Sequence, residues 1–159
     1  MILKPQPLTQ AAFAAFGDVL EATGDFRLIN AGLCQRHHDR ARIDVGADAR
    51  PGISIFRAEP RALPYEFALV ERHPDGSQAF LPMTEHPFLV IVAPDDAGQP
   101  GPPRAFLTNG AQGINLHRGT WHGVLTPLTA PGRFAVVDRI GTTANLQEFT
   151  YSQPYVVTL

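Results

Sequence analysis

Two short polar segments, 71–83 and 113–122, carry side chains that could do acid–base chemistry on a small molecule. Their chemically suitable residues are Glu71, His73, Gln78, Asn115, His117 and His122. Imidazoles and carboxylates exchange protons, and side-chain amides match the donors and acceptors of a polar substrate. Packing alone rarely places charged and imidazole groups at consecutive inward positions. The two segments therefore predict a polar site inside a small β-barrel.

Strand alternation indicates which of these side chains share a face. Residues two apart on a strand point the same way, so Glu71 pairs with His73 and Asn115 pairs with His117. We expect both pairs to face the barrel interior, with His73 and His117 as acid and base. The order of the two roles stays open. His122 follows His117 across a short turn and is the weaker catalytic candidate, because it could equally be a hydrogen-bonded core residue.

An anionic substrate would need an arginine. Arg57 alternates with Ile53 and Ile55, so it could reach the same cavity. A buried arginine needs an anionic partner, which could be Glu71, Asp138 or a substrate carboxylate. We therefore expect Arg57 to be the first candidate for holding the substrate carboxylate.

Two further arginines are weaker candidates for substrate binding. Arg139 follows Asp138 directly, and only one of the two can face inward; alternation does not say which. Arg72 lies one residue out of phase with Glu71 and His73, so it should point to the opposite face. A surface ion pair is an equal alternative for Arg72.

Composition restricts the class of protein. The 159 residues, 44% hydrophobic and 18% charged, predict one globular domain over residues 1–159. A net charge of −2 gives no basic surface for nucleic acid. No signal peptide and no apolar run of about 20 residues is visible, so we expect no membrane association. Cys34 is the sole cysteine, which favours a reducing, cytoplasmic location.

The positioning elements are expected to be short strands, because 14 glycines and 15 prolines punctuate the chain. Thr9 can cap one short helix that Gly17 would end. The polar stretch 36–42 reads as a loop that could line a site. We predict an all-β barrel with one or two short helices and strands over 53–57, 65–71, 77–82, 88–93, 104–108, 114–117, 121–127, 133–139 and 155–159.

The arrangement resembles the jelly-roll barrels of the cupins. Their first motif reads His-x-His followed by Glu, and their second motif supplies one more His. In this chain the matching positions are Glu71, His73, Gln78 and His117. A neutral amide is a poorer ligand for a divalent cation than a carboxylate. We therefore assign no cofactor, and a divalent metal ion stays open as the less favoured alternative.

The resemblance narrows to the ureidoglycolate lyase family. It rests on these segments: Ile29-Asn30-x-Gly32, His38-Asp39, Glu71-Arg72-His73-Pro74-x-Gly76-x-Gln78-Ala79-Phe80, Thr108-Asn109-Gly110-x-Gln112-Gly113-x-Asn115-x-His117-Arg118-x-x-Trp121-His122 and Asp138-Arg139. The resemblance implies a cupin-like barrel, a homodimer, and a C–N lyase that splits ureidoglycolate into glyoxylate and urea during allantoin breakdown. The apolar segment Tyr155–Val157, which would expose a strand edge in a monomer, also favours a homodimer.

Two other functions fit a cupin-like barrel, because fold alone does not determine function. The first is a non-catalytic sensor that binds a small organic acid without turnover. The second is a metal-dependent oxygenase or isomerase, which would retain metal after purification. The product also distinguishes two reactions on the same substrate, since hydrolysis of the ureido group releases ammonia whereas the lyase reaction releases urea.

Overall fold

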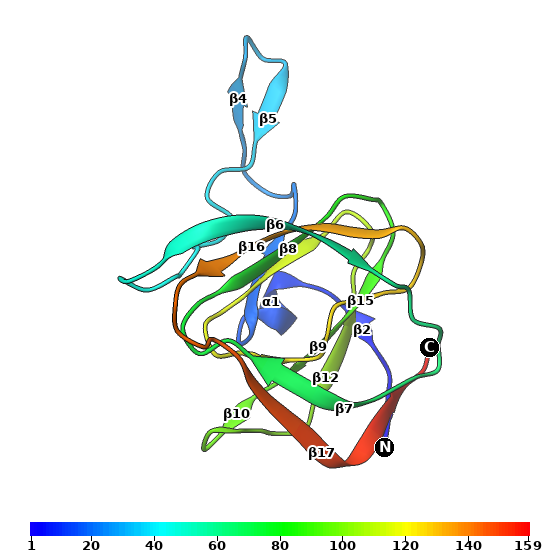
Figure 1. Cartoon of the computed structure of the whole chain (residues 1–159). Coiled ribbons are helices and arrows are strands. Elements are labelled where there is room, and N and C mark those ends of the chain that lie inside the picture. Colours follow the sequence, from blue (N-terminus) through cyan, green and yellow to red (C-terminus); the bar gives the residue numbers. More distant parts are fainter.

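Two β-sheets face each other across an apolar interior in the computed structural model, which describes all 159 residues (Figure 1). The eight-stranded sheet contains, in spatial order, β1 (Ile2–Leu3), β17 (Gln147–Val157), β7 (Tyr65–Arg72), β14 (Trp121–His122), β9 (Phe88–Ala93), β12 (Arg104–Leu107) and β2 (Gln6–Pro7), with β15 (Thr126–Pro127) also paired to β9. The five-stranded sheet contains β3 (Gly17–Leu20), β13 (Gly113–Leu116), β8 (Gln78–Pro82), β16 (Gly132–Ile140) and β6 (Arg50–Ala58). The predicted all-β, cupin-like barrel is confirmed.

The single short helix, α1 (Gln10–Phe13), begins where the sequence predicts. The Thr9 hydroxyl accepts a hydrogen bond from the Ala12 backbone N–H at 3.2 Å, which caps the first turn. The helix ends before Gly17, so the prediction that this glycine ends it is wrong. Gly17 opens β3 instead, where a β-carbon would overlap the carbonyl oxygen of Asn115. The glycine therefore permits close approach of two strands.

The barrel interior is filled by apolar side chains from both sheets and α1. On β9, Phe88, Val90 and Val92 face this interior, as expected for a strand buried on both sides. The alternate residues of β9 pack in a second cluster on the other face of the sheet. The interior cluster consists of Leu8, Phe13, Phe16, Val19, Phe80, Phe88, Val90, Val92, Phe106, Ile114, Leu116, Phe134 and Val136.

The C-terminal strand differs from the prediction in length and place. β17 begins at Gln147 rather than Tyr155, and it pairs with β7 on one side and with β1 on the other. Tyr155 and Val157 are consequently buried within the chain. This segment therefore leaves no exposed apolar edge in a single chain, and the prediction that it would is wrong. The predicted single strand over 121–127 is likewise divided, into β14 and β15.

Two small hairpins were not predicted. One, β10 (Asp95–Asp96) with β11 (Gln99–Pro100), lies in the expected 95–103 loop. The other, β4 (Arg27–Ile29) with β5 (Cys34–Arg36), projects away from the barrel on the side of the five-stranded sheet (Figure 1). We call residues 26–37 the arm. The structure contains no helix with the length and apolar content needed to cross a bilayer.

Candidate active site

Glu71, His73 and His122 come together at one end of the barrel. Glu71 is on β7, His73 follows that strand, and His122 lies directly opposite Glu71 in the β7–β14 register. One ligand atom from each residue lies within 4.8 Å of the others. The rings of the two histidines are 5.3 Å apart, centroid to centroid. We call these three residues the inner cluster.

The hydrogen bonds of the two histidines set their tautomers. Nδ1 of His73 lies 2.6 Å from the carbonyl oxygen of Asn145, and Nδ1 of His122 lies 2.9 Å from that of Gly123. A carbonyl oxygen only accepts, so each Nδ1 carries a hydrogen, and in the neutral ring Nε2 is the atom with the free lone pair. Both Nε2 atoms are buried and have no partner within the protein. Buried polar atoms are normally satisfied, so this pair indicates a ligand site.

Burial shifts the pKa values of Glu71 and His122 in a way that favours their neutral forms. It raises the pKa of the Glu71 carboxyl; nearby His73 opposes that shift and Glu148 adds to it. Burial lowers the pKa of His122 to about 4, although the Gly123 carbonyl acts in the opposite direction. His122 is therefore an uncharged acceptor at neutral pH.

Gln78 and Asp138 face the same interior. Gln78 alternates with the core residue Phe80, and its Nε2 donates to a carboxylate oxygen of Asp138 at 3.2 Å. The Oε1 atom of Gln78 is buried without a partner. Asp138 is thus the inward residue of the Asp138–Arg139 pair. Arg139 lies on the opposite face of β16, beside Gly76 and Gly141.

The segment 141–146 lies over His73. Besides the carbonyl that binds His73, the side-chain oxygen of Asn145 accepts from the Asp75 backbone N–H at 2.7 Å. The Thr143 hydroxyl donates to the Asp75 carboxylate at 3.1 Å. On the opposite, apolar side of His122 there is a cavity of only about 20 Å³. Asn145 could not be found from the residue pattern, because it contacts His73 through its backbone carbonyl.

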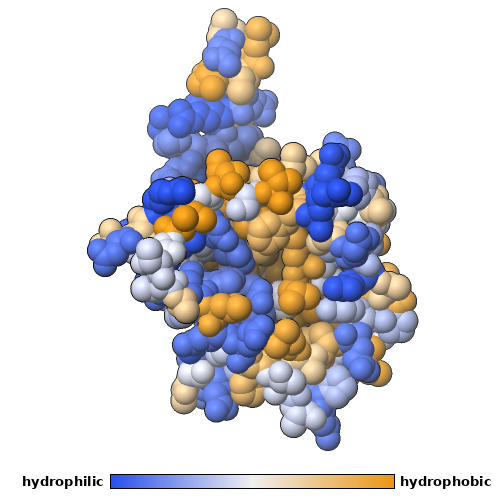
Figure 2. Space-filling view, in the orientation of Figure 1, coloured by the Kyte–Doolittle hydropathy of each residue, from blue (hydrophilic) through white to orange (hydrophobic).

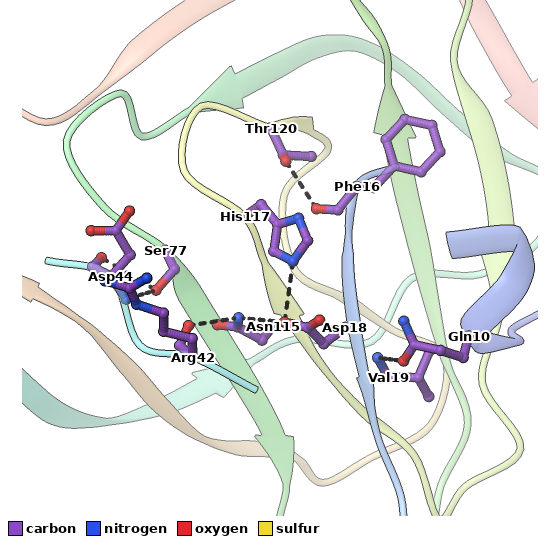
Figure 3. Close-up of polar contacts among 10 residues, drawn as sticks. All are labelled: Gln10, Phe16, Asp18, Val19, Arg42, Asp44, Ser77, Asn115, His117 and Thr120. Carbon is purple, nitrogen blue, oxygen red and sulfur yellow. Dashed lines mark hydrogen bonds and ion pairs between the residues drawn. The ribbon is translucent and has the colours of Figure 1, made fainter. Parts of the chain in front are cut away.

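His117 and Asn115 lie elsewhere, on the outside of the five-stranded sheet (Figure 3). Ile114 and Leu116 take the interior positions of β13, so Asn115 points outward, and His117 does the same. The prediction that they face inward is therefore wrong. The two residues do share a side, but a shift of one position exchanges the two faces of a strand.

A separate polar hollow of about 360 Å³ surrounds His117. Nε2 of His117 contacts the Asp18 carboxylate at 3.2 Å, and the Asn115 amide donates to the same oxygen at 3.0 Å. The His117 side chain is 48% exposed. We call this group the outer cluster; its members are Asp18, Arg42, Asp44, Ser77, Asn115, His117 and Arg118.

None of the three candidate arginines joins the inner cluster. Arg57 is exposed on the face of β6 that also carries Ile53, itself 77% exposed. The expectation that this face turns inward is wrong, because Phe56 packs against the core residue Phe80 instead.

Arg72 points to the face opposite Glu71, as predicted. It forms an ion pair with Asp95 at 2.7 Å and donates to Gln147 at 2.7 Å. Its guanidinium lies 4.4 Å from the centre of the Trp121 ring. These contacts describe a structural ion pair rather than a substrate contact.

The inner cluster has the donor set of a divalent-cation site. Two imidazoles present unpartnered Nε2 atoms, and Glu71 supplies a carboxylate. Each imidazole donates its other N–H to a backbone carbonyl, which is the usual outer-shell contact of a metal-binding histidine. His122, and not His117, is therefore the histidine that joins Glu71 and His73 in this cluster.

Comparison with known proteins points to one family. The family model described as ureidoglycolate lyase matches residues 1–158. A protein of Rhodobacter capsulatus named ureidoglycolate lyase is 59% identical over 153 residues, which cover 96% of this chain and 95% of that protein. One of Chelativorans sp., with the same name, is 53% identical over 97% of this chain and 94% of its own length. Ureidoglycolate lyase 2 of Rhizobium meliloti is 48% identical over 96% of this chain and 94% of its own length.

Proposed function

The chain belongs to the ureidoglycolate lyase family, and on this premise we propose that it cleaves ureidoglycolate into glyoxylate and urea at the inner cluster. The observation that carries the assignment to this cluster is the pair of buried, unpartnered Nε2 atoms of His73 and His122 beside the Glu71 carboxyl. The outer cluster is more exposed, and its polar groups largely pair with one another.

The reaction requires one proton to move. Ureidoglycolate carries a hydroxyl, a carboxylate and a ureido nitrogen on one carbon. Glu71 accepts the hydroxyl proton while the electron pair of the O–H bond forms the carbonyl and the C–N bond breaks. The same carboxyl then returns the proton to the departing nitrogen, which releases neutral urea. A carboxyl whose pKa is raised by burial suits both halves of this transfer.

The remaining groups orient the substrate. The Nε2 atoms of His73 and His122 and the Oε1 atom of Gln78 are acceptors, so they can receive hydrogen bonds from the ureido N–H groups. Alternatively, the same atoms of Glu71, His73 and His122 would hold a divalent cation instead of these contacts, and that cation would polarise the hydroxyl and bind the substrate carboxylate. Asp138 holds the Gln78 amide in place through its 3.2 Å hydrogen bond.

A single incubation tests the reaction class. Purified protein is mixed with ureidoglycolate, and glyoxylate, urea and ammonia are measured together, before and after treatment with a chelator. We expect glyoxylate and urea in equal amounts and no ammonia. Release of ammonia in proportion to glyoxylate would indicate hydrolysis of the ureido group, and binding without any product would indicate a sensor. Loss of activity on chelation, with recovery on adding back a divalent cation, would support a metal at the inner cluster.

We also propose that the working form is a homodimer. The resemblance implies this state, and exposed apolar side chains on the arm and on β6 support it. The inner cluster is built from one chain, so the chemistry itself does not require a second copy.

A further inference from the structure

The two halves of the inner cluster meet across a short joint between strands. Glu71 and His73 belong to β7 and the residues after it, whereas His122 belongs to β14, a strand of two residues. β14 pairs with β9 at both of its positions, but with β7 only where His122 lies opposite Glu71. The placing of His122 against Glu71 therefore depends on this one pair and on side-chain contacts across the joint.

A group of side chains crosses the joint on the outward face of the sheet. Arg72 and Trp121 are the chain neighbours of Glu71 and His122, and strand alternation turns them to the opposite side. The guanidinium of Arg72 lies 4.4 Å from the centre of the Trp121 ring. One carboxylate oxygen of Asp95 accepts from Nε1 of Trp121 at 2.9 Å and from Arg72 at 2.7 Å. These contacts bind β7 to β14 on the face that the inner cluster does not use.

The members of this group are anchored on both sides of the joint. Asp95 lies two residues after β9 ends, and the backbone N–H of Gly98 donates to its second carboxylate oxygen at 3.1 Å. On the other side, Nε of Arg72 donates to Gln147 of β17 at 2.7 Å, and the two residues lie opposite each other in the β7–β17 register. We call Arg72, Asp95, Trp121 and Gln147 the clamp.

We propose that the clamp positions the inner cluster: by joining β7 to β14 on the outward face, it fixes His122 opposite Glu71 on the inward face. This inference rests on the proposed function, because it assigns the clamp a part in that reaction. The clamp residues act through their chain neighbours, so they are positioning residues and not catalytic ones. A displacement of about 1 Å at a reacting group can lower a rate by about 100-fold, so a small slip at the joint would be costly.

Arginine suits the centre of the clamp. Its planar guanidinium can lie over an indole ring and donate hydrogen bonds in two directions at once, which an ammonium group cannot do with the same geometry. The ion pair of Arg72 with Asp95 contributes little to stability by itself, because 48% of the Asp95 side chain is exposed. The clamp is therefore better explained by the geometry that it imposes than by the stability that it adds.

Steady-state kinetics of Arg72→Met test the proposal. Methionine keeps an apolar stem but removes the guanidinium. We expect kcat to fall by roughly 10- to 100-fold and KM to change by less than about threefold, because a misplaced Glu71 transfers its proton poorly while Gln78 still contacts the substrate. Arg72→Lys should recover part of the lost kcat, since its ammonium can still pair with Asp95 and lie over the Trp121 ring.

A matched control separates positioning from stability. Only 19% of the Arg72 side chain is exposed, so methionine adds little to the apolar surface that the molecule already shows at the tip of the arm and beside its base (Figure 2). Val157→Ala is the control, because Val157 is buried in the same apolar cluster as Trp121 but lies at the far end of β17 from Gln147. It should lower the melting temperature and leave kcat near the wild-type value. A wild-type kcat in folded Arg72→Met would overturn the proposal, however much its melting temperature falls.

Nuclear magnetic resonance of the imidazole rings gives a measurement that does not depend on activity. The ring C–H signals of His73 and His122 report on the two sides of the joint. We expect the His122 signals to shift in Arg72→Met and to stay in place in Val157→Ala. Ring signals that stay in place in both variants would contradict a positioning role. A wild type that does not cleave ureidoglycolate would refute the proposed function, and the ring signals alone would then decide whether the clamp positions the cluster.

Discussion

The inner and outer clusters contain similar residues, but they differ in which polar atoms lack a hydrogen-bond partner and so can bind a substrate. Each combines histidine with a carboxylate. In the inner cluster the imidazoles use Nδ1 on backbone carbonyls and keep Nε2 free inside the barrel. In the outer cluster Nε2 of His117 already contacts Asp18, and the ring is half-exposed.

The charges of the two clusters differ in the same way. A hydrogen bond from Arg118 holds the pKa of the Asp44 carboxyl at about 2, so this acid stays ionised at any ordinary pH. Burial instead raises the pKa of Glu71 toward the range in which it can exchange protons. Desolvation and unsatisfied atoms, rather than residue types, therefore distinguish a reactive group from a stable ion pair.

The largest effect should come from Glu71. We expect Glu71→Gln to lower turnover by roughly two to four orders of magnitude, the usual contribution of a positioned proton donor and acceptor. The variant should be no less stable, because a neutral amide has less hydration to lose in this buried position. Steady-state kinetics and thermal melting on the same sample check both. Near wild-type turnover would remove Glu71 from the mechanism.

Two histidine variants test directly which of the two clusters is the active site. We expect His122→Ala to lower turnover by roughly 100-fold, whereas His117→Ala should change it by less than about threefold. His122 presents a free acceptor to the substrate, and His117 does not reach the inner cluster. Melting curves must show that both variants fold. The reverse ranking would move the active site to the outer cluster.

The buried His122 should also make stability depend on pH. Its pKa is about 4 in the folded chain against an ordinary value of 6.5, so the unfolded chain binds more protons between these values. This contribution is complete above about pH 6.5 and is lost as the pH falls toward 4. The shift corresponds to about 3 kcal/mol of unfolding free energy.

Urea denaturation at pH 7 and pH 4.5 measures this effect. We expect the wild type to lose more stability over this range than His122→Asn does. Glu71, whose pKa is raised, acts in the opposite direction, but both proteins retain it, so the difference between them isolates His122. Equal losses in the two proteins would show that His122 is not buried in a neutral form.

The smallest effect concerns the segment over His73. Asn145→Ala removes the side-chain oxygen that accepts from the Asp75 N–H but keeps the carbonyl that binds His73. We expect turnover to fall about tenfold, because a loosened segment orients His73 less well, with a loss of about 1 kcal/mol in stability. Thr143→Ala is the matched control, since Thr143 also bonds Asp75 but does not touch His73. Equal turnover in both variants would argue against a positioning role for Asn145.

Strand periodicity predicted much of the fold and half of the site. Alternation correctly paired Glu71 with His73 and put Arg72 on the other face, because consecutive strand residues point to opposite sides. It failed on β13 and β6. In both strands the sequence offers apolar residues at alternate positions, and only packing against the opposite sheet shows which set is buried. His117, Asn115 and Arg57 were misplaced for this reason.

The sequence by itself determined that the chain is an all-β domain, that two polar motifs contain its candidate catalytic residues, and that it resembles the ureidoglycolate lyases. These follow from local patterns and residue types, which do not depend on distant contacts. Only the tertiary structure decided that His122 rather than His117 completes the cluster with Glu71 and His73. That choice depends on the pairing of β14 with β7, strands far apart in the sequence, and on the 141–146 segment that reaches back to His73. Such contacts are fixed by the packing of the whole barrel.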